Sequence, residues 1–206
     1  MRLFDLDTPR SRDVERLWLV GGCVRDLMLE RQPRDLDLEV FGIPAGQLHA
    51  LLTEHFPVQF VGRAFGVFKL DGLPIDVSLP IRRPLEEATV PGLLHLADHE
   101  MDIDDALSRR DFTINAMAWD PDTLEFRDPF QGRDDLDTRT LRHVSERFAE
   151  DPLRVLRGMQ LAARYELTAA PETAAFCRSL TQDALPHERD RKSTRQNSSH
   201  VALSRM

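Results

Sequence analysis

Cysteine is scarce in this sequence: the chain of 206 residues contains only Cys23 and Cys177. The two lie far apart and match neither a disulfide framework nor a zinc-binding spacing, which favours a reducing compartment. Each is most simply a small apolar side chain of the interior. We therefore expect a cytoplasmic protein.

Long apolar runs are also missing. No stretch reaches the ~18 consecutive apolar residues that a helix needs to span a bilayer. Residues 1–13 carry acidic side chains where a secretory signal peptide has basic ones followed by an apolar core. Neither membrane insertion nor secretion is expected.

A surplus of basic charge is absent as well, because the formal net charge is −8. Residues 189–206 hold five basic side chains and one acidic one, so residues 1–188 carry −12. An acidic body argues against broad, non-specific phosphate binding. It leaves room for a focused basic site, and six arginines fall between residues 139 and 164.

Helical and strand-like patterns alternate in the first 80 residues. In order, the expected elements are a strand (17–20), a glycine turn (21–22), a helix (23–30), a strand (35–42), a helix (45–56) and two or three strands (57–80). This order predicts an α/β (α+β) fold with a small mixed sheet.

The rest of the chain is expected to be mainly helical and irregular. The expected features are a loop and helix start (84–108), turns around Pro121 and Gly132, a long helix (145–167) beginning at Ser145 or Asp151, and a helix from Pro171. Residues 189–206 lack a periodic apolar face, which predicts disorder. We interpret them as a non-native extension from cloning or sequencing.

Three acidic residues share one face of the strand expected at residues 35–42. Asp35 and Asp37 point the same way about 6.5–7 Å apart, so a divalent cation could offset their repulsion. Asp76, flanked by Ile75 and Val77, is a candidate third carboxylate from another strand. Glu39 lies one step farther along and is a poorer ligand. The alternative is an open sheet face with solvated acids.

Two further patterns could bind nucleotide. The turn at Gly21 and Gly22 opens a helix whose exposed N–H groups favour phosphate, with Arg25 as a nearby fixed positive charge. Asp151 and Arg154, with Arg157, lie opposite an apolar helix side and could pair with a base edge. The apolar side comprises Val155, Leu156, Met159, Ala162 and Ala163. The alternatives are a structural joint with a surface arginine, and a solvated helix face.

Four segments together resemble one family. "LVGGCVRD", "RDLDLEVFG", "RRDFTINAMAWD" and "EDPLRVLRGMQLAAR" are similar in order and spacing to the head and neck of class II tRNA nucleotidyltransferases, the CCA-adding and poly(A) polymerase family. The resemblance covers residues 17–166. It implies a polymerase β-like nucleotidyltransferase head (1–140), the start of a helical neck (141–188) and a tail (189–206).

The resemblance also implies roles for individual residues. Asp35 and Asp37 would hold catalytic Mg²⁺, with Asp76 as the third catalytic carboxylate. The implied nucleotide-binding set is Gly21, Gly22 and Arg25 at the triphosphate, Arg110, Asp111 and Asn115 at the nucleotide and its sugar, and Asp151, Arg154 and Arg157 at the base. Gln160 stands where the family often has another arginine.

The implied reaction adds CMP or AMP from CTP or ATP to the 3′ end of tRNA and releases pyrophosphate. Addition of CC alone, of A alone or of a poly(A) tail fits the same four segments. So does a nucleotide- or RNA-binding module without turnover. The oligomeric state is left open by the sequence.

Overall fold

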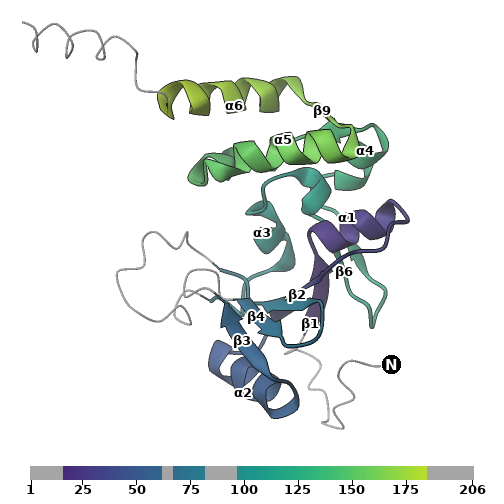
Figure 1. The fold of residues 1–206 in the computed structure, drawn as a ribbon, viewed down its shortest axis with the longest axis vertical. Coiled ribbons are helices and arrows are strands. Elements are labelled where there is room, and N and C mark those ends of the chain that lie inside the picture. The colour runs from purple at the N-terminus through teal and green to yellow at the C-terminus, as the bar shows by residue number, and fades with distance from the viewer. Residues whose placement is uncertain (1–15, 62–66, 82–96, 185–206) are drawn as a thin grey trace, which may run out of the picture. The chain divides into compact units, whose positions relative to one another are not determined.

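A seven-stranded mixed sheet forms the framework of the larger part of the chain (Figure 1). The computed structural model describes residues 16–61, 67–81 and 97–184, and the chain divides into two units, residues 1–169 and 170–206. The strands are β1 (Arg16–Val20), β2 (Leu36–Phe41), β3 (Val58–Val61), β4 (Val67–Leu70), β5 (Ile75–Ser78), β6 (Ala118–Trp119) and β7 (Phe126–Arg127). Their order is β3-β4-β5-β2-β1-β6-β7. Within this sheet, as far as the structure describes it, β2 and β5 are the one parallel pair, which confirms the expected mixed sheet.

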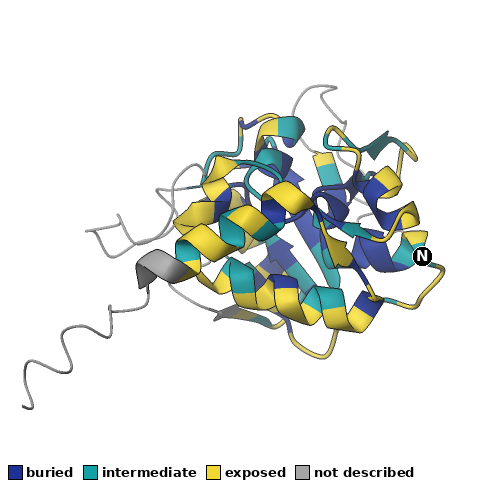
Figure 2. Ribbon diagram, turned by 90° about the horizontal axis from the view of Figure 1, so that it is seen from above, coloured by how far each residue is buried: buried dark blue, intermediate teal, exposed yellow. Residues whose placement is uncertain are grey.

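The two faces of the sheet are covered by different helices, and buried residues concentrate in the strands between them (Figure 2). Leu38 and Val40 of β2 join a core cluster with α1 (Gly22–Met28) and α2 (Ala45–His55). Trp18 of β1 joins the other cluster, with α3 (Ile103–Ser108). Because side chains alternate along a strand, Asp37 and Glu39 point to the α3 side.

Three strands, rather than two, arise from the segment expected to hold two or three. The turn between β4 and β5 contains Gly72, whose φ of 80° is a left-handed conformation that glycine adopts without penalty. Leu73 N–H donates to the carbonyl of Leu70 across this turn. The tight connection places β4 beside β5, which in turn lies beside β2.

The long helix expected at residues 145–167 is interrupted. A 3-10 helix, η4 (Glu146–Glu150), precedes α5 (Leu153–Tyr165). Asp151 adopts an extended conformation because the following Pro152 disfavours helical geometry at that position. The Asp151 carboxylate accepts from the Leu153 N–H at 2.9 Å. A helix therefore begins just after each predicted start, η4 after Ser145 and α5 after Asp151. The chain is not helical at Asp151, which separates the two.

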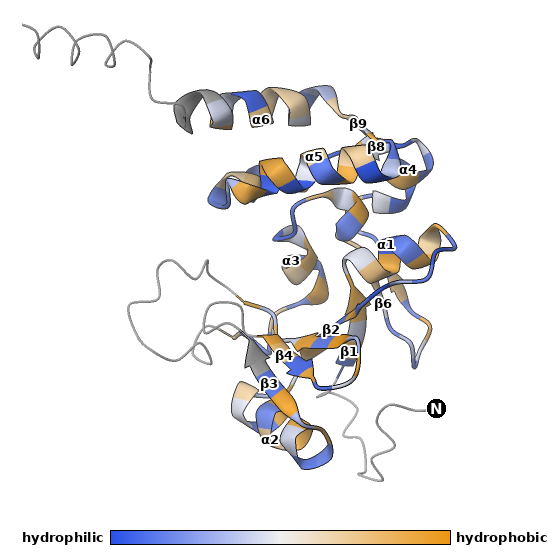
Figure 3. Ribbon diagram, viewed as in Figure 1, coloured by the Kyte–Doolittle hydropathy of each residue, from blue (hydrophilic) through white to orange (hydrophobic). Residues whose placement is uncertain are grey.

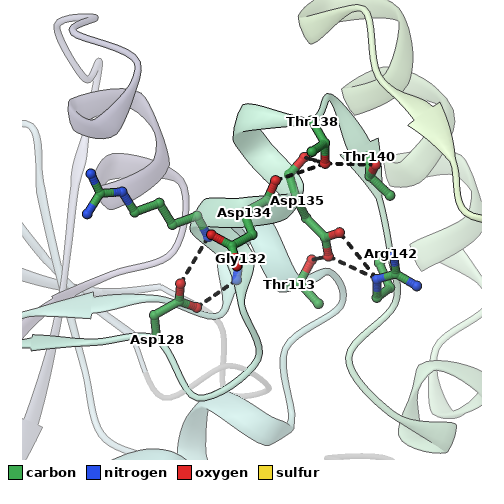
Figure 4. A network of polar contacts seen from close by, with 9 residues as sticks. Thr113, Asp128, Gly132, Asp134, Asp135, Thr138, Thr140 and Arg142 are labelled. Atoms are coloured by element: carbon green, nitrogen blue, oxygen red, sulfur yellow. Dashed lines mark hydrogen bonds and ion pairs between the residues drawn. The ribbon is translucent and has the colours of Figure 1, made fainter.

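A polar network ties α4 (Gly132–Asp137) to the 3-10 turn η3 (Thr113–Asn115) (Figure 4). Asp135 accepts from the Thr113 hydroxyl at 2.8 Å and from Arg142 Nε at 3.1 Å. Asp128 accepts from the Gly132 N–H at 2.7 Å. A Cβ on Gly132 would lie 2.1 Å from the Thr113 carbonyl oxygen, so only glycine fits. The network holds the "RRDFTINA" segment rigidly.

Short strands β8 (Thr140–Leu141) and β9 (Thr168–Ala169) pair in parallel and complete the first unit. The second unit contains α6 (Pro171–Ala184), the helix expected from Pro171. The tail at 189–206 lies outside the described residues. In the part of the chain that the structure describes, no helix combines the length and apolarity needed to cross a membrane.

Candidate functional site

Asp37 and Asp76 are direct cross-strand partners in the parallel pairing of β2 and β5. Asp35 immediately precedes β2 and is exposed. Burial raises the pKa of the Asp37 carboxyl, the negative charges of Asp76 and Asp35 raise it further, and Arg110 opposes the shift. Both of the other predicted carboxylates therefore act electrostatically on Asp37.

Lys69 of β4 already pairs with one of these carboxylates. It lies opposite Asp76 in the β4–β5 register, and its Nζ is 2.6 and 2.8 Å from the two Asp76 carboxylate oxygens. Half of the Lys69 side chain remains accessible. The pair is an exposed ion pair, of the kind that contributes about 0.2–1 kcal/mol.

The carboxylates fit a divalent cation by their chemistry. Among the residues described, no three acidic, histidine or cysteine side chains are already gathered as in a preformed metal site. The raised pKa of Asp37 shows, however, that negative charge is unfavourable there, and a divalent cation would relieve this. Carboxylate oxygens are the ligands that Mg²⁺, Mn²⁺ and Ca²⁺ prefer. Asp35 and Asp37 are the residues able to hold such an ion, and Asp76 becomes available when Lys69 releases it.

Arg110 lies between the glycine turn and the carboxylates. Gly21 has a φ of 74°, a conformation that favours glycine, and a Cβ added to it would be 2.7 Å from Arg110 Nη1 and 3.6 Å from Asp37 Oδ2. Arg110 Nη2 donates to Glu39 Oε2 at 3.1 Å, and Glu39 is buried. Glu39, a poor candidate for the metal, instead holds the Arg110 guanidinium beside Asp37.

Arg25 is not the surface side chain that the structural alternative predicts, because only 5% of it is accessible. All three of its guanidinium nitrogens donate to protein acceptors. Nε and Nη2 donate to Asp26 Oδ1 at 3.0 and 2.8 Å, Nη1 to Asn115 Oδ1 at 2.6 Å, and Nη2 also to the Tyr165 hydroxyl at 2.6 Å. Gly22 packs directly against this guanidinium. Direct contact of Arg25 with a triphosphate stays a prediction.

Asp111 links the "RRDFTINA" segment to α5. Its Oδ1 accepts from Asn115 Nδ2 at 3.1 Å, and its Oδ2 pairs with Arg157 Nε at 3.2 Å. Arg157 Nη2 reaches Asp151 Oδ2 at 2.9 Å. The i,i+3 pair between Asp151 and Arg154, expected for a solvated helix face, is replaced by this bridge between Asp151 and Asp111.

Arg154 points its guanidinium at the backbone. Nη1 donates to the Arg147 carbonyl at 2.9 Å and Nη2 to the Arg109 carbonyl at 2.8 Å. Burial lowers the pKa of Arg154, and the carboxylate of Asp111 opposes the shift. Beside these carbonyls a pocket of about 260 Å³ is lined by Met101, Asp105, Ser108, Arg109 and Arg147.

The polar side of α5 carries the contacts with the head, and its apolar side is accessible. Gly158 is buried, and a Cβ there would lie 2.7 Å from Phe112 Cζ. Leu156 and Met159 are 56% and 66% exposed. Figure 3 shows hydrophobic and hydrophilic residues alternating along this helix. The predicted base-selecting residues Arg154 and Arg157 thus lie on the side of α5 that contacts the head.

Four residues of this arrangement had no role from sequence reasoning: Asp26, Glu39, Lys69 and Tyr165. Asp26 lies within "GGCVRD" and Glu39 within "DLDLEVFG", so their segments were identified without their contacts. Tyr165 is the only tyrosine of the chain, which could have drawn attention to it. Nothing in the sequence around Lys69 indicates a role for it, because its pairing with Asp76 depends on the β4–β5 register.

The family model described as Poly A polymerase head domain matches residues 17–142, more than half of the chain. The Multifunctional CCA protein of Stenotrophomonas maltophilia (strain R551-3) is 38% identical over 181 residues, which cover 84% of this chain and 43% of that protein. The protein of the same name from Leptothrix cholodnii (strain ATCC 51168 / LMG 8142 / SP-6) is 41% identical over 182 residues, covering 84% and 41%. The chain spans less than half the length of these relatives.

Solved structures that are similar to this chain belong to the same kind of enzyme as these relatives. A tRNA nucleotidyltransferase complexed with a primer tRNA and an incoming ATP analog has a TM-score of 0.63 at 28% identity, covering 83% of this chain and 48% of that chain. A tRNA-processing enzyme with CTP has a TM-score of 0.64 at 27% identity, covering 82% and 43%. The expected head fold is confirmed, and nucleotidyltransferases of this kind generally use divalent metal ions. The chain belongs to the poly(A) polymerase head-domain family of nucleotidyltransferases.

Proposed function

We propose that this chain carries the catalytic and nucleotide-selecting part of an enzyme that adds CMP or AMP, from CTP or ATP, to the 3′ end of tRNA and releases pyrophosphate. The observation that carries the proposal is the direct pairing of Asp37 with Asp76 on a face that also holds Arg110. The relatives named Multifunctional CCA protein support it. So do the similar structures solved with CTP and with primer tRNA.

The proposed cofactor is Mg²⁺, held by Asp35 and Asp37 with Asp76 as a third carboxylate. When bound, Mg²⁺ activates an attacking hydroxyl and stabilises a pyrophosphate leaving group. The protein supplies the rest of the reaction by positioning and by neutralising charge. Asp37 and Asp76 lie on paired strands of the sheet, which fixes their backbone positions relative to each other.

The triphosphate is proposed to lie against the turn at Gly21 and Gly22, where Arg110 offers a guanidinium 2.7 Å from the place a Gly21 side chain would occupy. Asp111 and Asn115, joined by their own hydrogen bond, would face the sugar. Arg25 hydrogen-bonds Asn115 at 2.6 Å and is proposed to contact the triphosphate as well.

Base selection is proposed for Asp151, Arg154 and Arg157. A carboxylate and two guanidinium groups supply the acceptors and donors that a base edge requires. Two of these three already hydrogen-bond each other, so an incoming base would exchange into an ordered arrangement. The domain assignment of a head at 1–140 and a neck at 141–188, and a cytoplasmic location, are further parts of the proposal.

The test is incubation of the chain with Mg²⁺, labelled CTP or ATP, and three tRNAs. The 3′ ends of these tRNAs lack all of CCA, the final CA, and the final A, respectively. A full-length curated relative serves as the positive control. Incorporation that Asp35→Ala abolishes supports the proposal, and the pattern of additions distinguishes CCA addition from CC, A or poly(A) addition. Tight binding of nucleotide without incorporation, under conditions in which the relative is active, would instead indicate a binding module.

A further inference from the structure

Tyr165, the last residue of α5, has a hydroxyl with two buried partners. It donates to Asp26 Oδ1 at 2.8 Å and accepts from Arg25 Nη2 at 2.6 Å. The Arg25 guanidinium also stacks on the tyrosine ring, with Cζ 4.3 Å from the ring centroid. All three residues are at most 9% accessible. A buried network in which each polar group has a partner is rigid and specific.

From this cluster, a series of hydrogen bonds and one ion pair runs to the residues near the start of α5. Arg25 Nη1 donates to Asn115 Oδ1 at 2.6 Å, and Asn115 Nδ2 donates to Asp111 Oδ1 at 3.1 Å. Arg157 Nε then pairs with Asp111 Oδ2 at 3.2 Å, and Arg157 Nη2 donates to Asp151 Oδ2 at 2.9 Å. We refer to this series, from Asp26 and Tyr165 to Asp151, as the relay.

The relay fastens α5 at two separated points. Tyr165 and Arg157 are eight residues apart, so at ~1.5 Å per residue their contacts lie roughly 12 Å apart along the helix. Tyr165 fixes one end against α1, and Arg157 fixes the other part against Asp111. Between them Gly158 allows Phe112 to approach closely. The tilt and rotation of α5 are therefore set jointly by both contacts.

We propose that Tyr165 is a positioning residue for nucleotide selection, which acts through Arg25, Asn115 and Asp111 on Arg157 and Asp151. This inference rests on the proposed function, because Asp151 and Arg157 are the side chains assigned to the base. Loss of the hydroxyl removes an acceptor from Arg25 and a donor from Asp26. Arg25 then keeps its bonds to Asp26 and Asn115 but loses one acceptor, so its guanidinium can shift and move Asn115 and Asp111 in turn.

Tyr165→Phe tests the proposal, since it deletes the hydroxyl and keeps the ring. The binding of CTP, ATP, GTP and UTP is measured by calorimetry for the chain and the variant. The preference for CTP and ATP over GTP and UTP should fall by about fivefold, the equivalent of one lost hydrogen bond of ~1 kcal/mol. Thr53→Ala, which removes a hydroxyl bonded within α2, is the matched control and should change nothing. An equal loss of affinity for all four nucleotides would show a merely structural role.

A second readout requires no nucleotide. NMR of the arginine Nε–H groups reports Arg25 and Arg157 individually, with Arg16, which pairs with Glu125, as the internal control. Tyr165→Phe should move both the Arg25 and the Arg157 signals and leave Arg16 unchanged. An unmoved Arg157 signal overturns the relay even if the enzyme is active. If the parent chain binds no nucleotide, the proposed function fails while this measurement still decides the coupling.

Asp26→Asn is the independent second variant, in case Tyr165→Phe does not fold. It weakens the same cluster from the α1 side and should reduce base preference in the same way. In the double variant, the losses should be less than additive because both changes act through Arg25. Fully additive losses would contradict a single relay.

Discussion

Asp37 and Asp76 lie directly opposite each other across the parallel strands β2 and β5, and Lys69 on the next strand bonds both oxygens of Asp76. The sheet thus presents two carboxylates side by side while a lysine neutralises one of them. Any divalent cation that engages Asp76 must compete with the Lys69 ammonium. The same ammonium also lowers the pKa of Asp37, which burial raises.

Lys69→Met should therefore lower the Mg²⁺ concentration needed for half-maximal metal binding. The expected change is at most about fivefold, because an exposed ion pair contributes only about 0.2–1 kcal/mol. Isothermal titration with Mg²⁺ or Mn²⁺ measures it without any reaction. Lys69→Arg, which keeps the charge, is the matched control and should remain near the parent value. A weaker metal affinity in Lys69→Met would mean that Lys69 assists the site rather than competing for it.

Glu39→Ala should weaken nucleotide binding through Arg110. The buried Glu39 carboxylate holds Arg110 Nη2 at 3.1 Å, and its loss leaves a charged guanidinium without this partner. Hydrogen bonds to charged groups contribute about 1.5–3 kcal/mol, so the KM for ATP should rise at least about tenfold. Steady-state kinetics measure the KM for ATP of this chain with and without the substitution. The same substitution at the equivalent position of a full-length relative is measured in parallel.

Glu39→Gln is the control for the charge alone. Its amide oxygen still accepts from Arg110, so the rise in KM should be smaller than in Glu39→Ala. Equal effects of the two substitutions would show that negative charge near Asp37, and not the position of Arg110, is what Glu39 provides.

Gly158→Ala should lower the free energy of unfolding by disturbing the packing of α5 against the head. The added Cβ would meet Phe112 Cζ at 2.7 Å, and Phe112 is fully buried against Phe148 at a centroid distance of 5.3 Å. Overpacking of this kind destabilises by about 1–3 kcal/mol, partly offset by the better helix propensity of alanine. Gly46→Ala in α2, where nothing lies within 4 Å, should instead stabilise by about 0.5–1 kcal/mol. Urea denaturation of both variants measures the difference, and equal behaviour would disprove the close packing.

The strand and helix patterns of residues 17–80 could be predicted from the sequence because apolar periodicity dictates which face is buried. The alternation in β2 put Asp37 and Glu39 on one face, and the structure agrees. What could not be predicted is which charged group each carboxylate meets. Lys69 reaches Asp76 only through the strand register, and Glu39 reaches Arg110 across 71 positions of sequence.

The environment of Arg25 was likewise beyond sequence reasoning. A surface arginine requires an accessible guanidinium, whereas the fold closes α5 over Arg25 and supplies Tyr165 from 140 positions away. The contacts of α5 also depend on the fold. Gly158 packs against Phe112, Arg154 and Arg157 have polar partners in the head, and Leu156 and Met159 remain accessible.

Tyr165 should make the stability of the chain depend on pH in the alkaline range. Burial, and then the hydrogen bond to Asp26, raise the pKa of Tyr165 above its ordinary value of about 10. Above that value the unfolded chain releases the phenolic proton while the folded chain retains it, so the free energy of unfolding falls as pH rises. Tyr165→Phe lacks this contribution, and the stability advantage of the parent over the variant should shrink as the pH rises above about 10. Urea denaturation at stepped pH measures this loss of stability.

The titration of Tyr165 can also be followed directly. Because Tyr165 is the only tyrosine, absorbance near 295 nm reports its titration. Coincident titration curves for the native and the urea-unfolded chain would contradict the buried hydroxyl.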